Sequence, residues 1–191
     1  DLFITYSSHL SMKLPFAATA LLIGAVRALE CPSEYMESMS LHDGELTFSY
    51  AIVDSSVLCA RLERDSEGWI GLGISPTGTM SGGEAVIGVP DDLTVQKYNL
   101  SGDSPRVSAM PDEKQTLMLT SITQEGGKTI MEFAKNLMED GEHEILTEGK
   151  NTFLYALGPD NTLGYHGTTR GPFSLDFAGV SMDMSSGKFI N

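Results

Sequence analysis

Apolar residues recur at every second position in parts of this chain, and this period constrains the fold more than any other feature. The alternation with polar or small residues is clearest at Leu46, Phe48, Tyr50 and Ile52. Such a period is typical of a strand with one buried face. Residues 57–62 form another short candidate strand, and residues 69–74 are apolar enough to be buried. Helical periods are scarce, so we expect the chain to fold mainly as strands.

Glycine, proline and aspartate separate the candidate strands. Residues 115–123 and 128–135 flank Glu125-Gly126-Gly127, which predicts a hairpin. Residues 152–157 read as a late strand that ends at the turn sequence Gly158-Pro159-Asp160-Asn161. The acidic stretch 136–144 fits either a loop or one helical turn. Many short strands with such punctuation predict an all-β fold, an antiparallel sandwich or barrel, in one domain.

The N-terminal residues have the pattern of a secretory signal. Met12-Lys13 begins a short basic region, residues 14–26 are mostly apolar, and Val26-Arg27-Ala28 resembles a cleavage site. An N-terminal helix of the mature fold or a membrane anchor is the alternative. We therefore expect residues 1–28 to hold upstream residues plus the signal, and residues 29–191 to form the domain. No later stretch is apolar for long enough to predict a membrane span.

Charge and cysteine content narrow the possible partners and the compartment. The formal net charge of −14 argues against nucleic acid and anionic membranes as partners. Cys31 and Cys59 are the two cysteines, and after secretion they are expected to form one disulfide, two buried free thiols being the alternative. Asn99-Leu100-Ser101 is a glycosylation sequon. Together these features favour a secreted or extracellular protein.

Met80 stands among Ser, Thr and Gly in the stretch Gly68–Gly88, where no apolar period explains it. A thioether on a glycine loop is suited to serve as a soft metal ligand. Among the four histidines, the best candidate for its partner is His166, which glycines flank. His42 and His143 are expected to be solvated. The chain has no dinucleotide loop, nucleophile elbow or H-E-x-x-H motif, so no catalytic residue is predicted.

Several sequence blocks together resemble a known family. They are GWIGLGISPTGTMSGGEAVIG, residues 95–99, Met131-Glu132-Phe133, TFLYALG and YHGTTRG. Their order and spacing over about residues 45–177 are similar to those of a DOMON domain, an immunoglobulin-like β-sandwich. The chain departs from that pattern at Gly83-Glu84-Ala85, where the family often has Gly-Ala-Asp after the loop methionine.

The resemblance to the haem-binding branch of this family, which includes the cytochrome domain of cellobiose dehydrogenase and secreted DOMON cytochromes, implies a function. It implies that Met80 and His166 are the axial ligands of a b-type haem, bound non-covalently since no C-x-x-C-H motif is present. Tyr98, Arg170 and Lys135 are candidates to hold the haem propionates. The expected role is single-electron transfer, with a redox protein or a small-molecule donor as partner.

Other functions are also compatible with the sequence. A haem-free DOMON module would bind sugars or another ligand, or support a larger redox protein, and a membrane domain in a longer parent protein is compatible with the sequence. A copper monooxygenase fits poorly, because its site needs several histidines. A measurement of haem uptake distinguishes the haem-binding hypothesis from these alternatives.

Overall fold

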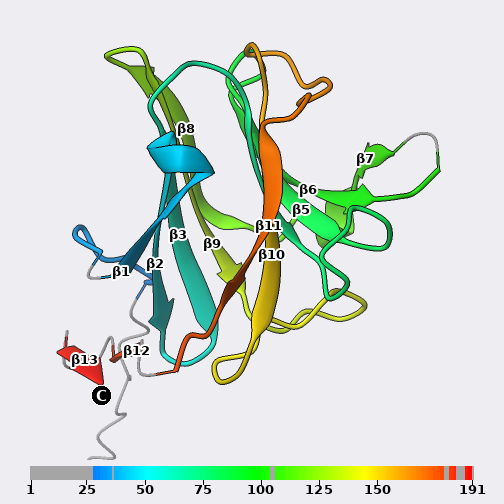
Figure 1. Ribbon diagram of the computed structural model, residues 1–191. Coiled ribbons are helices and arrows are strands. Elements are labelled where there is room, and N and C mark those ends of the chain that lie inside the picture. Colours follow the sequence, from blue (N-terminus) through cyan, green and yellow to red (C-terminus); the bar gives the residue numbers. More distant parts are fainter. Residues whose placement is uncertain (1–27, 36, 104–105, 179–180, 184–187, 191) are drawn as a thin grey trace, which may run out of the picture.

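Two antiparallel sheets packed face to face make up the domain (Figure 1). The computed structural model describes residues 28–35, 37–103 and 106–178, and the backbone of residues 181–183 and 188–190. The expected signal segment, apart from Ala28, lies outside the described residues. Nearly all regular structure in the described part is strand, so the predicted all-β sandwich is confirmed.

The first sheet, sheet A, has the strand order β13-β12-β2-β3-β9-β8, with β1 also paired to β2. Its neighbours run antiparallel except for the short parallel contact of β12 with β2. The strands are β1 Glu37–Leu41, β2 Leu46–Val53, β3 Val57–Arg64, β8 Met118–Glu125, β9 Lys128–Asn136, β12 Ser181–Asp183 and β13 Lys188–Ile190.

The second sheet, sheet B, has the order β11-β10-β4-β5-β6-β7, and all its neighbours run antiparallel. The strands are β4 Ile70–Ile74, β5 Glu84–Val89, β6 Thr94–Leu100, β7 Val107–Ala109, β10 Asn151–Leu157 and β11 Arg170–Leu175. The core strand β4 lies between β10 and β5, so residues from three strands meet around it on each face of the sheet.

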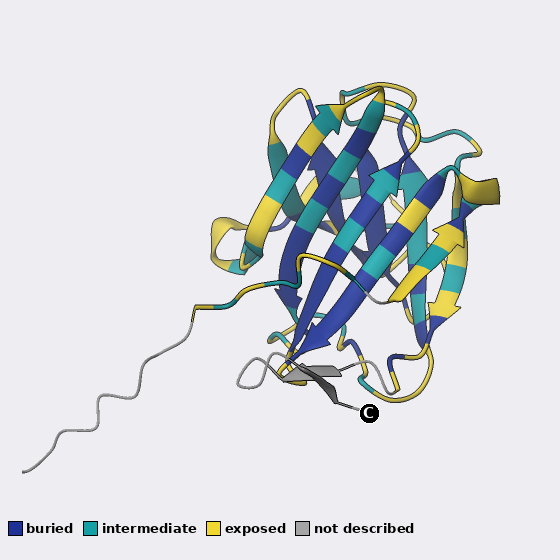
Figure 2. Ribbon diagram, turned by 90° about the vertical axis from the view of Figure 1, so that its left-hand side faces the viewer, coloured by how far each residue is buried: buried dark blue, intermediate teal, exposed yellow. Residues whose placement is uncertain are grey.

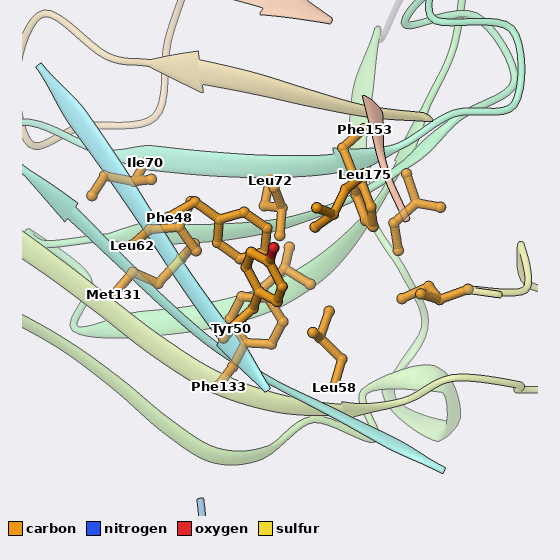
Figure 3. Packing of buried hydrophobic residues seen from close by; sticks show 14 of the residues in the cluster. Phe48, Tyr50, Leu58, Leu62, Ile70, Leu72, Met131, Phe133, Phe153 and Leu175 are labelled. Carbon is orange, nitrogen blue, oxygen red and sulfur yellow. The ribbon is translucent and has the colours of Figure 1, made fainter. Parts of the chain in front are cut away.

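The hydrophobic core fills the space between the sheets (Figure 3). Alternate residues of each strand point inward, as the period-two pattern requires. The core is closely packed at Gly88, because a Cβ there would lie 2.8 Å from the sulfur of Met131. Sheet A contributes Phe48, Tyr50, Leu58, Leu62, Met131 and Phe133, and sheet B contributes Ile70, Leu72, Phe153 and Leu175.

The N-terminal segment 28–35 crosses the outer face of sheet A (Figure 2). Leu29, Cys31 and Tyr35 pack there on a small apolar cluster that includes Cys59. Cys31 and Cys59 form a disulfide with their Cα atoms 5.7 Å apart, so the predicted bridge is confirmed. Burial, followed by the charge of Glu132, raises the pKa of Tyr35 to about 12.

All six strands that the sequence predicts are present, namely β2, β3, β4, β8, β9 and β10. The predicted hairpin joins β8 to β9 through Gly126 and Gly127, whose φ angles of +61° and +80° suit glycine. Of the stretch 136–144, Asn136 ends β9, and residues 137–144 form a loop rather than a helical turn. The sequence prediction did not include β1, β5, β6, β7 and β11 or the short β12 and β13. Within the described ranges, no helix has both the length and the apolar character that crossing a membrane requires.

Candidate functional site

The outer face of sheet B, opposite the core, carries a second apolar cluster beside residues with little or no side chain. Because Ile70, Leu72 and Ile74 point into the core, Gly71 and Gly73 of β4 face outward. Ala156 pairs with Gly71, and Ala85 pairs with Gly73, so these small residues adjoin one another across three strands. The centre of this face therefore has few side-chain atoms.

Larger apolar side chains surround these small residues. The buried members of this outer cluster are Trp69, Ala85, Ile87, Val89, Tyr98 and Leu100. Partly buried residues pack against them: Met80, Val107, Leu154, Ala156 and Leu163. A Cβ on Gly71 would make ordinary contacts with Trp69 and Ile87, at 3.5 and 3.6 Å. The outer face of sheet B thus carries a mostly apolar cluster around its small residues.

Met80 reaches this face from the loop 75–83, which joins β4 to β5 and which we call the Met80 loop. The loop is held by its own hydrogen bonds: the Gly83 N–H donates to the Met80 carbonyl at 3.0 Å, and the Ser75 hydroxyl donates to the Thr79 carbonyl at 2.6 Å. Gly78 and Gly82 supply the positive φ angles that the loop needs. Met80 is partly buried against the outer cluster, which accounts for an apolar side chain in a polar loop.

His166 reaches the same cluster from the loop 158–169, the His166 loop, which joins β10 to β11. Leu157 and Thr169 close the base of this loop, since the Leu157 N–H donates to the Thr169 carbonyl at 2.9 Å. The Thr169 hydroxyl donates to the carbonyls of both Leu157 and His166, at 2.6 and 2.5 Å. Thr169 therefore holds the backbone of His166 against the end of β10.

The two loops leave sheet B at opposite ends. Ile74, at the end of β4 that enters the Met80 loop, pairs with Phe153, whereas Ile70 pairs with Leu157, where the His166 loop begins. Both loops nevertheless place a side chain against the outer cluster, because the imidazole of His166 lies 6.3 Å from the Trp69 ring in an edge-on arrangement. The fold therefore brings Met80 and His166, 86 positions apart in the sequence, onto one apolar surface.

The imidazole of His166 has a defined polar environment on one nitrogen. Nδ1 lies 3.2 Å from the Gly167 carbonyl and 3.2 Å from an Arg170 Nη1. Burial and the charge of Arg170 lower the pKa of His166, against an opposing effect of the Gly167 hydrogen bond. The ring is therefore neutral at neutral pH, the form in which histidine binds a metal. Because both neighbours are at Nδ1, Nε2 is the nitrogen available for a ligand.

Tyr98 and Arg170 lie on the same outer face as the two candidate ligands. Tyr98 pairs with Ala85 in the row that contains Gly73 and Leu154, and Arg170 pairs with Ala156 in the row that contains Gly71. Burial, followed by the charge of Asp92, raises the pKa of Tyr98, so its hydroxyl stays protonated. Arg170 also donates to the Gly167 carbonyl at 2.9 Å, and its side chain remains exposed.

Lys135 is not brought together with these residues. It lies on β9 of sheet A, and its ammonium group, 2% exposed, binds the carboxylates of Glu139 and Glu142. The structure thus gives Lys135 a set of partners away from the outer face of sheet B. Asn99, the sequon residue, is exposed on β6.

Two of the histidines expected to be solvated have specific partners. His42 Nδ1 lies 3.3 Å from the Tyr155 hydroxyl, and Nε2 lies 3.6 Å from a Glu45 oxygen. His143 Nε2 lies 2.7 Å from the carbonyl of Gly82, in the Met80 loop. No pattern in the sequence links His143 to that loop, because 61 positions separate the two residues.

Sequence reasoning also missed how the glycines and Trp69 form the site. Trp69 is buried, as the apolar stretch 69–74 predicts, but it packs in the outer cluster beside His166 rather than between the sheets. Its indole lies directly against Gly158, where a Cβ would fall 2.0 Å from Nε1. The alternation Gly71-Leu72-Gly73 was the available signal, because glycine at every second position of a buried strand leaves one face without side chains.

Two open grooves lie elsewhere on the domain. One, of about 410 Å³, lies between the β2–β3 turn and residues 136–148. The other, of about 380 Å³, lies between the N-terminal segment and sheet A. Neither is lined by Met80, Tyr98, Lys135, His166 or Arg170. Within the described ranges, no group of three or more His, Cys, Asp and Glu residues could hold a metal ion.

The two packed antiparallel sheets, with the Met80 loop and the His166 loop beside one outer face, define the class of this protein as a β-sandwich domain. The chain belongs to the DOMON domain family, whose model matches residues 42–158. The matched range includes Met80 and Tyr98 and ends before His166 and Arg170.

Two solved structures share the fold. The cytochrome b domain of pyranose dehydrogenase from Coprinopsis cinerea aligns with a TM-score of 0.53 and 16% identity, over 76% of this chain and 83% of that chain. The cytochrome domain of cellobiose dehydrogenase from Myriococcum thermophilum aligns with a TM-score of 0.52 and 15% identity, over 73% of this chain and 80% of that chain. Each is the cytochrome domain of a dehydrogenase.

Proposed function

We propose that this domain binds a b-type haem non-covalently on the outer face of sheet B, with Met80 and His166 as axial ligands, and transfers single electrons. The observation that carries the proposal is the placement of a thioether and a neutral imidazole against one apolar cluster, from loops at opposite ends of the sheet. The fold likeness to two cytochrome domains supports it.

The residues present fit such a group in shape and in donor chemistry. Gly71, Gly73, Ala85 and Ala156 carry little or no side chain, and the apolar side chains around them would contact a haem macrocycle. A methionine–histidine pair on a bound haem gives a six-coordinate iron that exchanges single electrons and favours the ferrous state. The chain's own part is to hold the two donor atoms and keep water from the apolar face.

Polar groups at the border of the face would bind the haem carboxylates. Arg170 is exposed beside His166, and its guanidinium suits a carboxylate because it offers a planar set of donors. The protonated hydroxyl of Tyr98 is a second donor on this face. Lys135 has no part in this site, because its ammonium group is already paired.

The proposed setting is extracellular. The disulfide between Cys31 and Cys59 supports it, since such bridges persist in oxidising compartments. There the domain would exchange electrons with a redox protein or a small-molecule donor. Its net charge of −14 favours a partner with a basic surface.

Haem titration of the purified domain tests this function. We expect one haem per chain and a low-spin, six-coordinate absorption spectrum in both oxidation states. Met80→Ala should convert the spectrum to high-spin, and His166→Ala should abolish or greatly weaken binding, because each removes one strong-field ligand.

Matched controls are available within the chain. Met138→Ala changes a methionine that is 70% exposed, and His42→Ala changes a histidine near Tyr155. Both variants should keep the low-spin spectrum. A folded wild-type domain that takes up no haem, or a spectrum that Met80→Ala leaves unchanged, would overturn the assignment.

A further inference from the structure

The Met80 loop is held not only by its own hydrogen bonds but also by residues outside it. The Gly82 N–H donates to the Leu100 carbonyl of β6 at 3.1 Å. The Gly82 carbonyl lies 2.7 Å from Nε2 of His143, within hydrogen-bond distance. Gly82, two residues after Met80, therefore has a partner for its N–H, which is the Leu100 carbonyl, and for its carbonyl, which is the His143 ring.

His143 is itself fixed to the strand that follows the loop. Its backbone N–H lies 3.1 Å from both carboxylate oxygens of Glu84, the first residue of β5. Glu84 is 9% exposed, so this bond is shielded from water. The ring and backbone of His143 thus span the C-terminal end of the Met80 loop, from Gly82 to Glu84.

A buried four-charge cluster holds the segment that carries His143. We define it as Lys97, Lys135, Glu139 and Glu142. Lys97 binds Glu142 at 2.6 Å and Glu139 at 3.2 Å, and Lys135 binds Glu142 at 2.9 Å and also contacts Glu139. The four side chains are 2% to 10% exposed. Two positive and two negative charges balance, as buried charges require.

The four-charge cluster fixes the segment that carries His143 to both sheets. Lys97 comes from β6 of sheet B and Lys135 from β9 of sheet A, so the two glutamates of the 137–144 loop bind both sheets at once. Glu142 immediately precedes His143. The backbone at His143 therefore has a fixed position relative to both sheets, and its imidazole adds a contact from this fixed position to the Gly82 carbonyl.

We infer that His143 is a positioning residue for Met80: it orders the turn 80–83 so that the thioether is in place before a metal binds. This inference rests on the proposed function, in which Met80 ligates the haem iron. A ligand that is already ordered loses less conformational entropy on binding, so the metal–sulfur bond is stronger. Met–iron bonds are weak enough for such support to decide whether the sixth position is filled.

His143→Ala and His143→Gln test the inference, with His42→Ala as the matched histidine control. Glutamine keeps an N–H donor at about the place of Nε2, whereas alanine removes it. In the haem-free protein, we expect the amides of Gly82 and Gly83 to exchange hydrogen at least tenfold faster in His143→Ala than in the wild type, and within threefold of the wild type in His143→Gln. The His42→Ala variant should leave this exchange unchanged.

The haem-loaded protein supplies the second readout. His143→Ala should show a mixture of high-spin and low-spin iron and a lower reduction potential, and His143→Gln should restore the low-spin spectrum. If His143→Ala matches the wild type in both exchange and spin state, or if glutamine fails to rescue either, the inference is wrong. A wild type that takes up no haem would instead overturn the proposed function, and the exchange rates would still show whether His143 orders the loop.

Discussion

At the scale of single residues, the Trp69 indole packs directly against the backbone of Gly158, so a side chain at Gly158 would displace the ring. A Cβ at Gly158 would overlap the indole, because it would lie 2.0 Å from Nε1. Gly158 also accepts a hydrogen bond from Arg64 and donates one to the Trp69 carbonyl at 2.8 Å. The backbone at Gly158 therefore cannot move away freely, and the ring has to move instead.

We predict that Gly158→Ala displaces Trp69 and destabilises the domain by about 1–3 kcal/mol, the usual range for a clash in a packed region. Trp69 is the single tryptophan, so its fluorescence reports the change directly. Emission should shift to longer wavelength as the 3% exposed ring gains contact with water. Gly164→Ala is the control, since a Cβ there meets nothing closer than 3.8 Å. Unchanged emission in Gly158→Ala would contradict the packing described.

At the scale of elements, the N-terminal segment depends on its covalent bond to β3. The segment 28–35 has no strand partner and is held by apolar packing and by the disulfide, which closes a loop with a sequence separation of 28. Loop-closure entropy for that length corresponds to about 3–4 kcal/mol. The double variant Cys31→Ser, Cys59→Ala should lose that much unfolding free energy in urea.

Reduction of the wild type provides an independent check on this prediction. A wild-type protein unfolded with reductant present should reach the same unfolding free energy as the double variant. The outer apolar cluster of sheet B should be unaffected, so the Trp69 emission of the folded variant should match that of the wild type. A loss below about 0.5 kcal/mol would mean that the bridge adds little to the packing of this segment.

At the scale of the whole molecule, the four-charge cluster makes stability depend on pH. Burial disfavours the charged form of Glu139, but hydrogen bonds from Lys135 and Thr116 and the lysine charges outweigh it, and the pKa falls from 4.5 to about 2. Because the folded pKa is the lower one, this stability is complete above about pH 4.5 and is lost as the pH falls towards 2. The difference corresponds to about 3 kcal/mol.

Glu139→Gln should therefore lower stability at neutral pH and flatten its decline between pH 4.5 and 2, as measured by urea unfolding at a series of pH values. Glu144→Gln removes an exposed carboxylate from the same loop and should leave the pH profile unchanged. Equal profiles for Glu139→Gln and the wild type would show that the cluster does not contribute in this way.

The sequence predicted the architecture well because burial on one face imposes a period of two, which is visible at β2 and β3 without any partner strand. It missed β11, whose Arg170-Gly171-Pro172 start contains no alternation and which pairs only with β10. The disulfide was predictable because the chain has two cysteines.

The candidate site was less predictable, because its residues come together only through strand pairing. Nothing local indicates that Lys135 turns to Glu139 and Glu142, or that His143 meets Gly82. Met80 and His166 were identified as candidates from composition and resemblance, whereas their common surface depends on the antiparallel register of β4 and β10.

The central claim, that Met80 ligates the iron, is tested most directly by NMR of the ferrous, haem-loaded domain with labelled methionine methyl groups. The chain has ten methionines, and one methyl resonance should move far upfield, because an axial ligand lies over the centre of the macrocycle. That resonance should be absent in Met80→Leu and present in Met138→Leu. A spectrum with no upfield methionine methyl, or one that Met80→Leu leaves in place, would contradict the account.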